Sequence, residues 1–253
     1  MNPLIVIPSR MASTRLPGKP LADIHGEPMI VHVWRRAVEA GIGPVLVAAG
    51  EVEIARAVEA AGGRAVLTRP DHASGSDRVF EAVGHVDPKN HHDVIVNLQG
   101  DLPMVEPAAL TSVLEPLVEP AVDIATLAIE IGDPEERVTP SIVKAVAPLA
   151  PDQRIARALY FTRVACPSGE GPLYHHIGIY AYRRAALARF VALPPGRLER
   201  REKLEQLRAL EAGLRIDVAL VDMAPFGVDT PADLERARAL LDPALLKPNG
   251  SRT

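Results

Sequence analysis

The first loop of the chain concentrates positive charge in a pattern that suits a chain of phosphates. Within PSRMASTRLPGKP, ten consecutive residues carry three cations, Arg10, Arg15 and Lys19. No acidic residue follows Arg10 until Asp23, and Ser13 adds a hydroxyl donor. Arginine offers a planar fork of donors to phosphate oxygens, and lysine offers a point charge. The loop therefore predicts a nucleoside triphosphate site; the alternative is a solvated basic loop.

Two aspartates stand where a metal ion would accompany such a phosphate chain. Asp101 follows the short apolar run at 94–97, and Asp229 directly precedes Thr230 and Pro231. Magnesium prefers oxygen ligands and takes one or two carboxylates together with phosphate oxygens. Thr230 and Pro231 suit the N-cap and first position of a helix, which leaves Asp229 available. Asp101 is thus a candidate magnesium ligand, and Asp229 is either a second ligand or a capping residue.

A further polar segment is SGSDR at 74–78, at the expected start of a helix. Backbone amides at a helix start lack intrahelical partners and can bind a ligand. Arg78 is a candidate for an anionic group, and the alternative is a surface salt bridge with Asp77 or Glu81. Gln99, two residues before Asp101, offers both a donor and an acceptor, which suits a polyol.

Alternating strands and helices must position these residues. Apolar runs predict strands at 4–7, 45–48, 64–67, 94–97, 123–131 and 216–220. Helical spacing predicts helices at 29–40, 51–61, 76–83, 107–117, 198–212 and 231–241. This alternation predicts an α/β fold whose mostly parallel sheet carries helices on both faces. Ligands of such sheets bind at the carboxyl ends of strands, where the basic loop and Asp101 fall.

The second half of the chain is less regular. Apolar runs at 142–147, 158–162 and 176–182 lack intervening helices of normal length, which predicts a mixed sheet with a small β excursion. In the helix predicted at 198–212, the spacing places Leu204 and Leu207 on the core face and Glu205 and Gln206 off it. We expect a single domain over 1–246 and a disordered polar tail over 247–253.

Composition excludes several classes of protein. The net charge of −4 disfavours general nucleic-acid binding, and a single cysteine, Cys166, rules out an intrachain disulfide. Neither a GxGxxG nor a GxxxxGK[ST] motif is present, so dinucleotide and P-loop chemistry are disfavoured. No apolar run approaches the ~18 residues that span a bilayer, and the start of the chain lacks signal-peptide features. We expect a cytoplasmic protein with no membrane partner.

The segment IPSRMASTRLPGKPLADIHGEPMI resembles the opening of the 3-deoxy-manno-octulosonate (Kdo) cytidylyltransferases, the CMP-Kdo synthetases. The resemblance continues in the same order through five further segments: HASGSDRVFEAV, VNLQGDLPMVEP, YHHIGIYAYRR, KLEQLRALEAG and FGVDTPADLERAR. It implies a Rossmann-like nucleotidyltransferase fold and a magnesium-dependent homodimer. It also implies transfer of CMP from CTP to Kdo, an acidic 3-deoxy sugar, with release of pyrophosphate, for lipopolysaccharide synthesis.

The resemblance also implies roles for individual residues. Asp101 and Asp229 would hold the catalytic magnesium, and Arg15 and Lys19 would stabilise charge on the leaving pyrophosphate. The residues expected to contact the nucleotide are Arg10, Ser13, Arg15, Lys19, Ser74, Asp77 and Gln99. The residues expected to contact the sugar are Arg78, Gln99, His176 (rather than His175), Glu205 and Gln206.

Several positions depart from the family pattern. Gly50 and Glu51 stand where an acidic pair is usual, and Leu102 replaces a glutamate beside Asp101. The connection 161–174 is short in a region that contributes to the dimer interface of the family. These departures leave open a related acceptor, such as an amino-Kdo or a nonulosonic acid. A non-catalytic nucleotide-binding protein on the same fold is the alternative of another class, although it would have no reason to keep the basic loop and both aspartates.

Overall fold

The computed structural model describes residues 1–242, which form two compact units. Unit 1 comprises Met1–Ile5, Asp87–Leu98 and Ala108–Ala224; unit 2 comprises Val6–Val86, Gln99–Pro107 and the described residues from Pro225 onward. The expectation of one domain over 1–246 stays a prediction. The tail expected at 247–253 lies outside the described residues.

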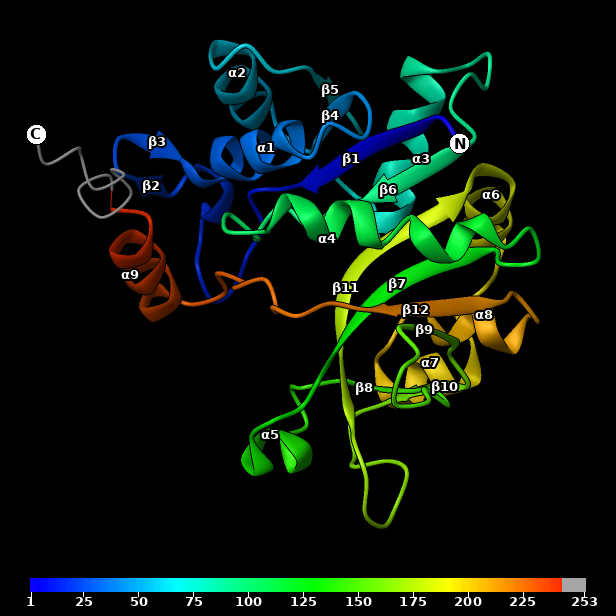
Figure 1. The fold of residues 1–253 in the computed structure, drawn as a ribbon. Helices are drawn as coiled ribbons and strands as arrows, with labels where there is room; N and C mark the ends of the chain where they lie inside the picture. The colour runs from blue at the N-terminus through cyan, green and yellow to red at the C-terminus, as the bar shows by residue number, and fades with distance from the viewer. Residues whose placement is uncertain (243–253) are drawn as a thin grey trace, which may run out of the picture. The chain divides into compact units, whose positions relative to one another are not determined.

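Unit 2 contains the predicted alternation of strands and helices (Figure 1). Its elements are the end of β1 (Pro3–Ser9), the 3₁₀ turn η1 (Lys19–Leu21), β2 (Asp23–Ile24), β3 (Glu27–Pro28), α1 (Met29–Glu39), β4 (Val45–Ala49), α2 (Val52–Ala60), β5 (Ala65–Leu67), α3 (Gly75–Val86) and α9 (Pro231–Leu240). β4 and β5 are parallel, as predicted, with Val47 opposite Ala65. The β2–β3 hairpin was not predicted, because two-residue strands are too short to show an apolar period.

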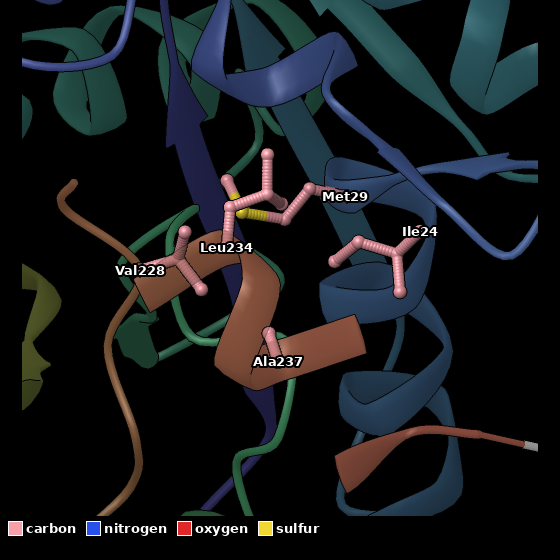
Figure 2. Close-up of a cluster of buried hydrophobic side chains, with 5 residues drawn as sticks. All are labelled: Ile24, Met29, Val228, Leu234 and Ala237. Atoms are coloured by element: carbon pink, nitrogen blue, oxygen red, sulfur yellow. The ribbon is translucent and has the colours of Figure 1, made fainter. Parts of the chain in front are cut away.

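A cluster of buried apolar side chains fixes the helix that follows Asp229. Figure 2 shows Val228, Leu234 and Ala237 of the C-terminal segment packed with Ile24 and Met29. All five are at most 7 % exposed, and Leu16 of the basic loop packs against them. Burying a side chain of this size contributes roughly 1.5–3 kcal/mol. The cluster therefore joins the basic loop to the start of α9 within unit 2.

Unit 1 holds the mixed part of the sheet. Its strands are the start of β1 together with β6 (Val94–Asn97), β7 (Ile124–Glu130), β8 (Lys144–Val146), β9 (Ile155–Arg157), β10 (Tyr160–Thr162), β11 (Tyr174–Arg183) and β12 (Ile216–Leu220). β11 is antiparallel to β6 and β7, whereas β12 is parallel to β7. The antiparallel pair β8–β10 forms the β excursion expected in the second half. The predicted mixed α/β fold is confirmed.

Two of the helices predicted in unit 1 differ from those in the structure. The six are α4 (Pro107–Ser112), α5 (Pro134–Val138), α6 (Arg184–Ala192), α7 (Arg197–Glu202), α8 (Leu207–Glu211) and the 3₁₀ turn η2 (Glu115–Val118). The helix predicted at 107–117 is wrong beyond Ser112, because Pro116 has no N–H to continue the ladder. The single helix predicted at 198–212 is also wrong: Lys203 has a left-handed backbone (φ 58°) and separates α7 from α8.

The break at Lys203 changes which side chains are buried. Gln206 is 7 % exposed, like Leu204, so the prediction that Gln206 lies off the core face is wrong. An uninterrupted helix would have turned residues 204 and 206 about 200° apart, onto opposite faces. Among residues 1–242, no helix is both long enough and apolar enough to cross a membrane.

Candidate active site

A cleft of about 710 Å³ lies within unit 2 at the carboxyl end of β1. Nine of the residues predicted from sequence line it: Arg10, Ser13, Arg15, Lys19, Ser74, Arg78, Gln99, Asp101 and Asp229. These residues come from four separate stretches of the chain, yet they share one cleft. The structure therefore brings the basic loop and both candidate metal ligands together.

Lys19 joins the two aspartates at the centre of this cleft. Its Nζ donates to Asp101 Oδ2 at 2.8 Å and to Asp229 Oδ1 at 3.0 Å. The second oxygen of Asp229 lies 3.0 Å from Arg15 Nη2. Burial alone would lower the pKa of Lys19, but the two carboxylates outweigh it and raise the pKa above its ordinary value. Lys19 is therefore a fixed positive charge between two carboxylates.

Local backbone contacts hold both aspartates in place. Thr230 caps α9 and shares a capping box with Asp233, so Asp229 is not needed as a cap. Val228 N donates to Asp101 O at 2.9 Å, which ties the two aspartate segments together. A Cβ on Gly100 would lie 2.9 Å from Pro8 O, so only glycine lets the Asp101 segment approach the end of β1 this closely.

The unusual pair Gly50-Glu51 supports the basic loop. Glu51 Oε2 accepts a hydrogen bond from Met11 N at 2.9 Å, which anchors the first turn of the loop. A Cβ on Gly50 would lie 3.0 Å from Arg78 Nη1 and 3.3 Å from Arg10 Cβ. Gly50 therefore lets the two arginine side chains lie against the backbone after β4.

Arg78 is not the surface residue of the alternative interpretation. It is 2 % exposed, and its guanidinium donates to Thr68 Oγ1 (2.6 Å) and Pro70 O (3.4 Å). Burial is the main cause that lowers its pKa from the ordinary value. The alternative of a surface salt bridge with Asp77 or Glu81 is therefore wrong: Arg78 is buried, and Asp77 accepts a hydrogen bond from Ser74 Oγ at 3.0 Å. Asp77 does not line the cleft.

Two polar residues of the cleft were missed from sequence. His72 forms a hydrogen bond through Nε2 with the Glu81 carboxylate, and its side chain is only 11 % exposed. Ser9, at the end of β1, has a buried Oγ without a hydrogen-bond partner among the described residues. His72 stands in the HASGSDR segment, so the segment itself was a usable signal. Ser9 carried none, because its burial depends on the tertiary packing.

The other predicted sugar-binding residues lie in unit 1. His176 is 8 % exposed, and its Nε2 lies 3.0 Å from Thr126 Oγ1. Burial, with a smaller contribution from His175, lowers the pKa of His176 to about 3, so its imidazole is neutral. Tyr180 packs 5.5 Å from the His176 ring. Glu205 is half-buried, 3.7 Å from Arg208, and Gln206 is buried.

The donor set of the cleft fits a magnesium ion. Asp101 and Asp229 direct oxygens at one common position, where a cation, the Lys19 ammonium, already lies. Within residues 1–242, no group of three or more His, Cys, Asp or Glu side chains is arranged for a metal. Two carboxylates completed by phosphate oxygens or water match the coordination that magnesium accepts.

Comparisons with known proteins decide the family. The cytidylyltransferase family profile matches residues 4–216. This chain belongs to the cytidylyltransferase family. A 3-deoxy-manno-octulosonate cytidylyltransferase of Rhodospirillum centenum is 69 % identical over 96 % of this chain and 94 % of its own length. That of Paramagnetospirillum magneticum is 66 % identical over 95 % and 98 %.

Solved structures support the same fold for this cytidylyltransferase. A structure of CMP:2-keto-3-deoxy-manno-octonic acid synthetase complexed with CTP is 43 % identical, with a TM-score of 0.87, over 95 % of this chain and 98 % of that one. A nucleotidyl transferase from Methanothermobacter is 17 % identical with a TM-score of 0.63, over 94 % and 97 %. The Rossmann-like nucleotidyltransferase fold expected from the sequence is confirmed.

Proposed function

We propose that this cytidylyltransferase transfers CMP from CTP to Kdo and releases pyrophosphate. The observation that carries the proposal is the convergence of Asp101 and Asp229 on Lys19, in a cleft lined by the basic loop. The Kdo acceptor is supported by the names of relatives that are 66–69 % identical over nearly the whole chain. No feature of the cleft favours an amino-Kdo or a nonulosonic acid over Kdo.

In the proposed reaction, a hydroxyl oxygen of Kdo attacks the α-phosphorus of CTP. The new oxygen–phosphorus bond forms as the bond from the α-phosphorus to the bridging oxygen breaks, and the hydroxyl proton passes to solvent. Lys19 and Arg15 then exchange carboxylate oxygens for phosphate oxygens and neutralise the leaving pyrophosphate. Such preorganised charges stabilise charge that develops in the transition state. Arg10, Ser13, Ser74 and Gln99 are proposed to position the nucleotide. Asp77, which does not line the cleft, would act through its hydrogen bond with Ser74 Oγ.

A magnesium ion held by Asp101 and Asp229 would bind phosphate oxygens and make the attacking hydroxyl more acidic. The two carboxylates are paired with Lys19 and Arg15, which holds their oxygens in position at the cleft. With Asp101 and Asp229 as ligands of the metal, the Lys19 ammonium would be available to the phosphate chain.

For the acceptor, we propose that Arg78, Gln99, His176, Glu205 and Gln206 bind the sugar. A neutral His176, oriented by Thr126, would serve as a hydrogen-bonding group and not as a proton donor. We further propose that the enzyme acts as a homodimer in the cytoplasm, where CTP is available.

Pyrophosphate release tests the proposal. We expect the protein to release pyrophosphate with CTP, Kdo and magnesium together, and not when any one is left out. ATP, GTP, sialic acid and an amino-Kdo serve as controls for each substrate. Release with another acid sugar but not with Kdo would show that the other sugar is the acceptor. If no acceptor leads to pyrophosphate release, the proposed transferase activity is wrong, and the alternative of a non-catalytic nucleotide-binding protein is favoured.

A further inference from the structure

Pro8, near the end of β1, lines the cleft together with residues of the basic loop, of the 72–78 segment and of the 99–101 segment. A Cβ on Gly75 would lie 3.4 Å from Pro8 Cγ, and one on Gly100 would lie 2.9 Å from Pro8 O. Pro8 therefore lies close to both the start of α3 and the Asp101 segment. His72 and Ser74, close before Gly75 in the chain, line the same cleft as the ion-paired group of Lys19, Asp101 and Asp229.

Under the proposed function, the phosphates and the metal lie at Lys19, Asp101 and Asp229. His72 lines the same cleft but is not one of these ion-paired residues, so it is available to the base of the nucleotide. His72 can form a hydrogen bond to a base edge from a fixed position, since the Glu81 carboxylate holds its ring.

Glu81 determines which nitrogen of His72 carries the proton. Glu81 accepts from His72 Nε2 and from Arg69 N at 3.2 and 3.4 Å, and His85 Nε2 lies 3.8 Å away. Burial would raise the pKa of Glu81, but the bonds from His72 and Arg69 hold it below the ordinary value. An ionised carboxylate only accepts hydrogen bonds, so Nε2 is the protonated nitrogen. In the neutral imidazole, Nδ1 is then an acceptor.

From this geometry we propose that His72 recognises the 4-amino group of cytosine through Nδ1, with Glu81 as the residue that positions it. The inference rests on the proposed CTP site. The amino group of cytosine is a donor, whereas the corresponding atom of uracil is an acceptor oxygen. An acceptor nitrogen therefore binds CTP and opposes UTP. His72 is thus a residue that determines specificity between the two pyrimidine nucleotides.

The test compares kcat/KM for CTP and UTP, with Kdo as acceptor, at about pH 8. The variants are His72→Leu, Glu81→Gln and His85→Leu. We expect His72→Leu to lower the CTP/UTP ratio about 10-fold or more, the effect of one lost hydrogen bond in a buried site. The loss falls on CTP, and UTP turnover is unchanged or higher.

Glu81→Gln keeps the size of the side chain but offers an amide donor to Nε2, which allows the other tautomer. We expect it to lower the same ratio and to improve UTP relative to wild type. His85→Leu is the matched control, because His85 also faces Glu81 but does not line the cleft. We expect the CTP/UTP ratio of kcat/KM in His85→Leu to equal the wild-type value.

If His72→Leu and Glu81→Gln each lower kcat/KM for CTP and for UTP by the same factor, the inference is overturned, and His72 has only a structural role. If the wild-type protein releases no pyrophosphate from CTP and Kdo, the proposed function fails. Calorimetric affinities for CMP and UMP still decide the inference in that case. A wild-type preference for CMP that His72→Leu removes supports it, and equal affinities in wild type overturn it.

Discussion

Replacing Lys19 by methionine separates the structural and chemical parts of its role. The change keeps the aliphatic stem and removes the ammonium from two ion pairs, 2.8 and 3.0 Å long, with side chains 15–47 % exposed. Partly exposed pairs contribute about 0.2–1 kcal/mol each, so unfolding should become easier by about 1 kcal/mol. In a protein of this size, that lowers Tm by roughly 2–4 °C.

The expected loss of activity is much larger than this loss of stability. Removing one preorganised charge from a phosphoryl-transfer site lowers kcat by roughly 10²–10³-fold. The assay is pyrophosphate release from CTP and Kdo at saturating substrate, with Tm measured on the same preparation. Arg35→Met is the control: Arg35 also forms an ion pair, with Glu27, but lies outside the cleft. We expect kcat of this control within about 2-fold of wild type.

A folded Lys19→Met protein that retains kcat within about 5-fold would refute the argument. It would mean that the lysine serves only to neutralise the two aspartates. A fall of Tm by more than about 10 °C would refute the stability argument instead, since it would require a far stronger ion pair.

Three further predictions follow from the same contacts. Asp101→Asn lowers kcat at least about 10²-fold, and a titration with magnesium shows weaker dependence on the metal, whereas unchanged metal dependence would contradict a ligand role. Ser9→Ala leaves the free energy of unfolding unchanged or raises it by up to about 1 kcal/mol, measured by urea unfolding, because it removes a buried hydroxyl without a partner. The folded pKa of His176 is about 3, below the ordinary 6.5, so its stabilising effect is present above pH 6.5 and is lost as pH falls toward 3. His176→Gln should therefore weaken the fall in stability between pH 6.5 and 5 by about 2 kcal/mol, and an unchanged pH profile would refute the burial argument.

Sequence patterns predicted the elements that depend on local periodicity. The strands at β4, β6 and β12 and the helices α1, α2 and α9 were found within one or two residues. Their signals were continuous apolar runs, helical spacing, and stop or cap residues such as Gly62 and Thr230. The strands β2, β3 and β9, of two or three residues each, were not predicted, because so short a segment has no measurable period of its own.

Failures occurred where packing overrode local preference. The segment 198–212 has the composition and spacing of one helix, but the left-handed Lys203 breaks it and buries Gln206 beside Leu204. From sequence, Arg78 was a candidate for an anionic group, with a surface salt bridge as the alternative. The structure instead buries it against the loop after β5, where Thr68 Oγ1 and Pro70 O accept its hydrogen bonds. Neither outcome follows from neighbours along the chain.

The sequence alone determined the chemical inventory of this protein: a loop of three cations, two aspartates suited to magnesium, and segments ordered as in the Kdo cytidylyltransferases. These properties depend on residue type and spacing, which are local. Only the tertiary structure decided that Lys19 lies between Asp101 and Asp229, that Ser9 is buried without a partner, and that Glu81 orients His72. The physical reason is that residues 82 and 210 positions apart meet only when strands and helices pack, and that burial fixes which polar atoms keep a partner.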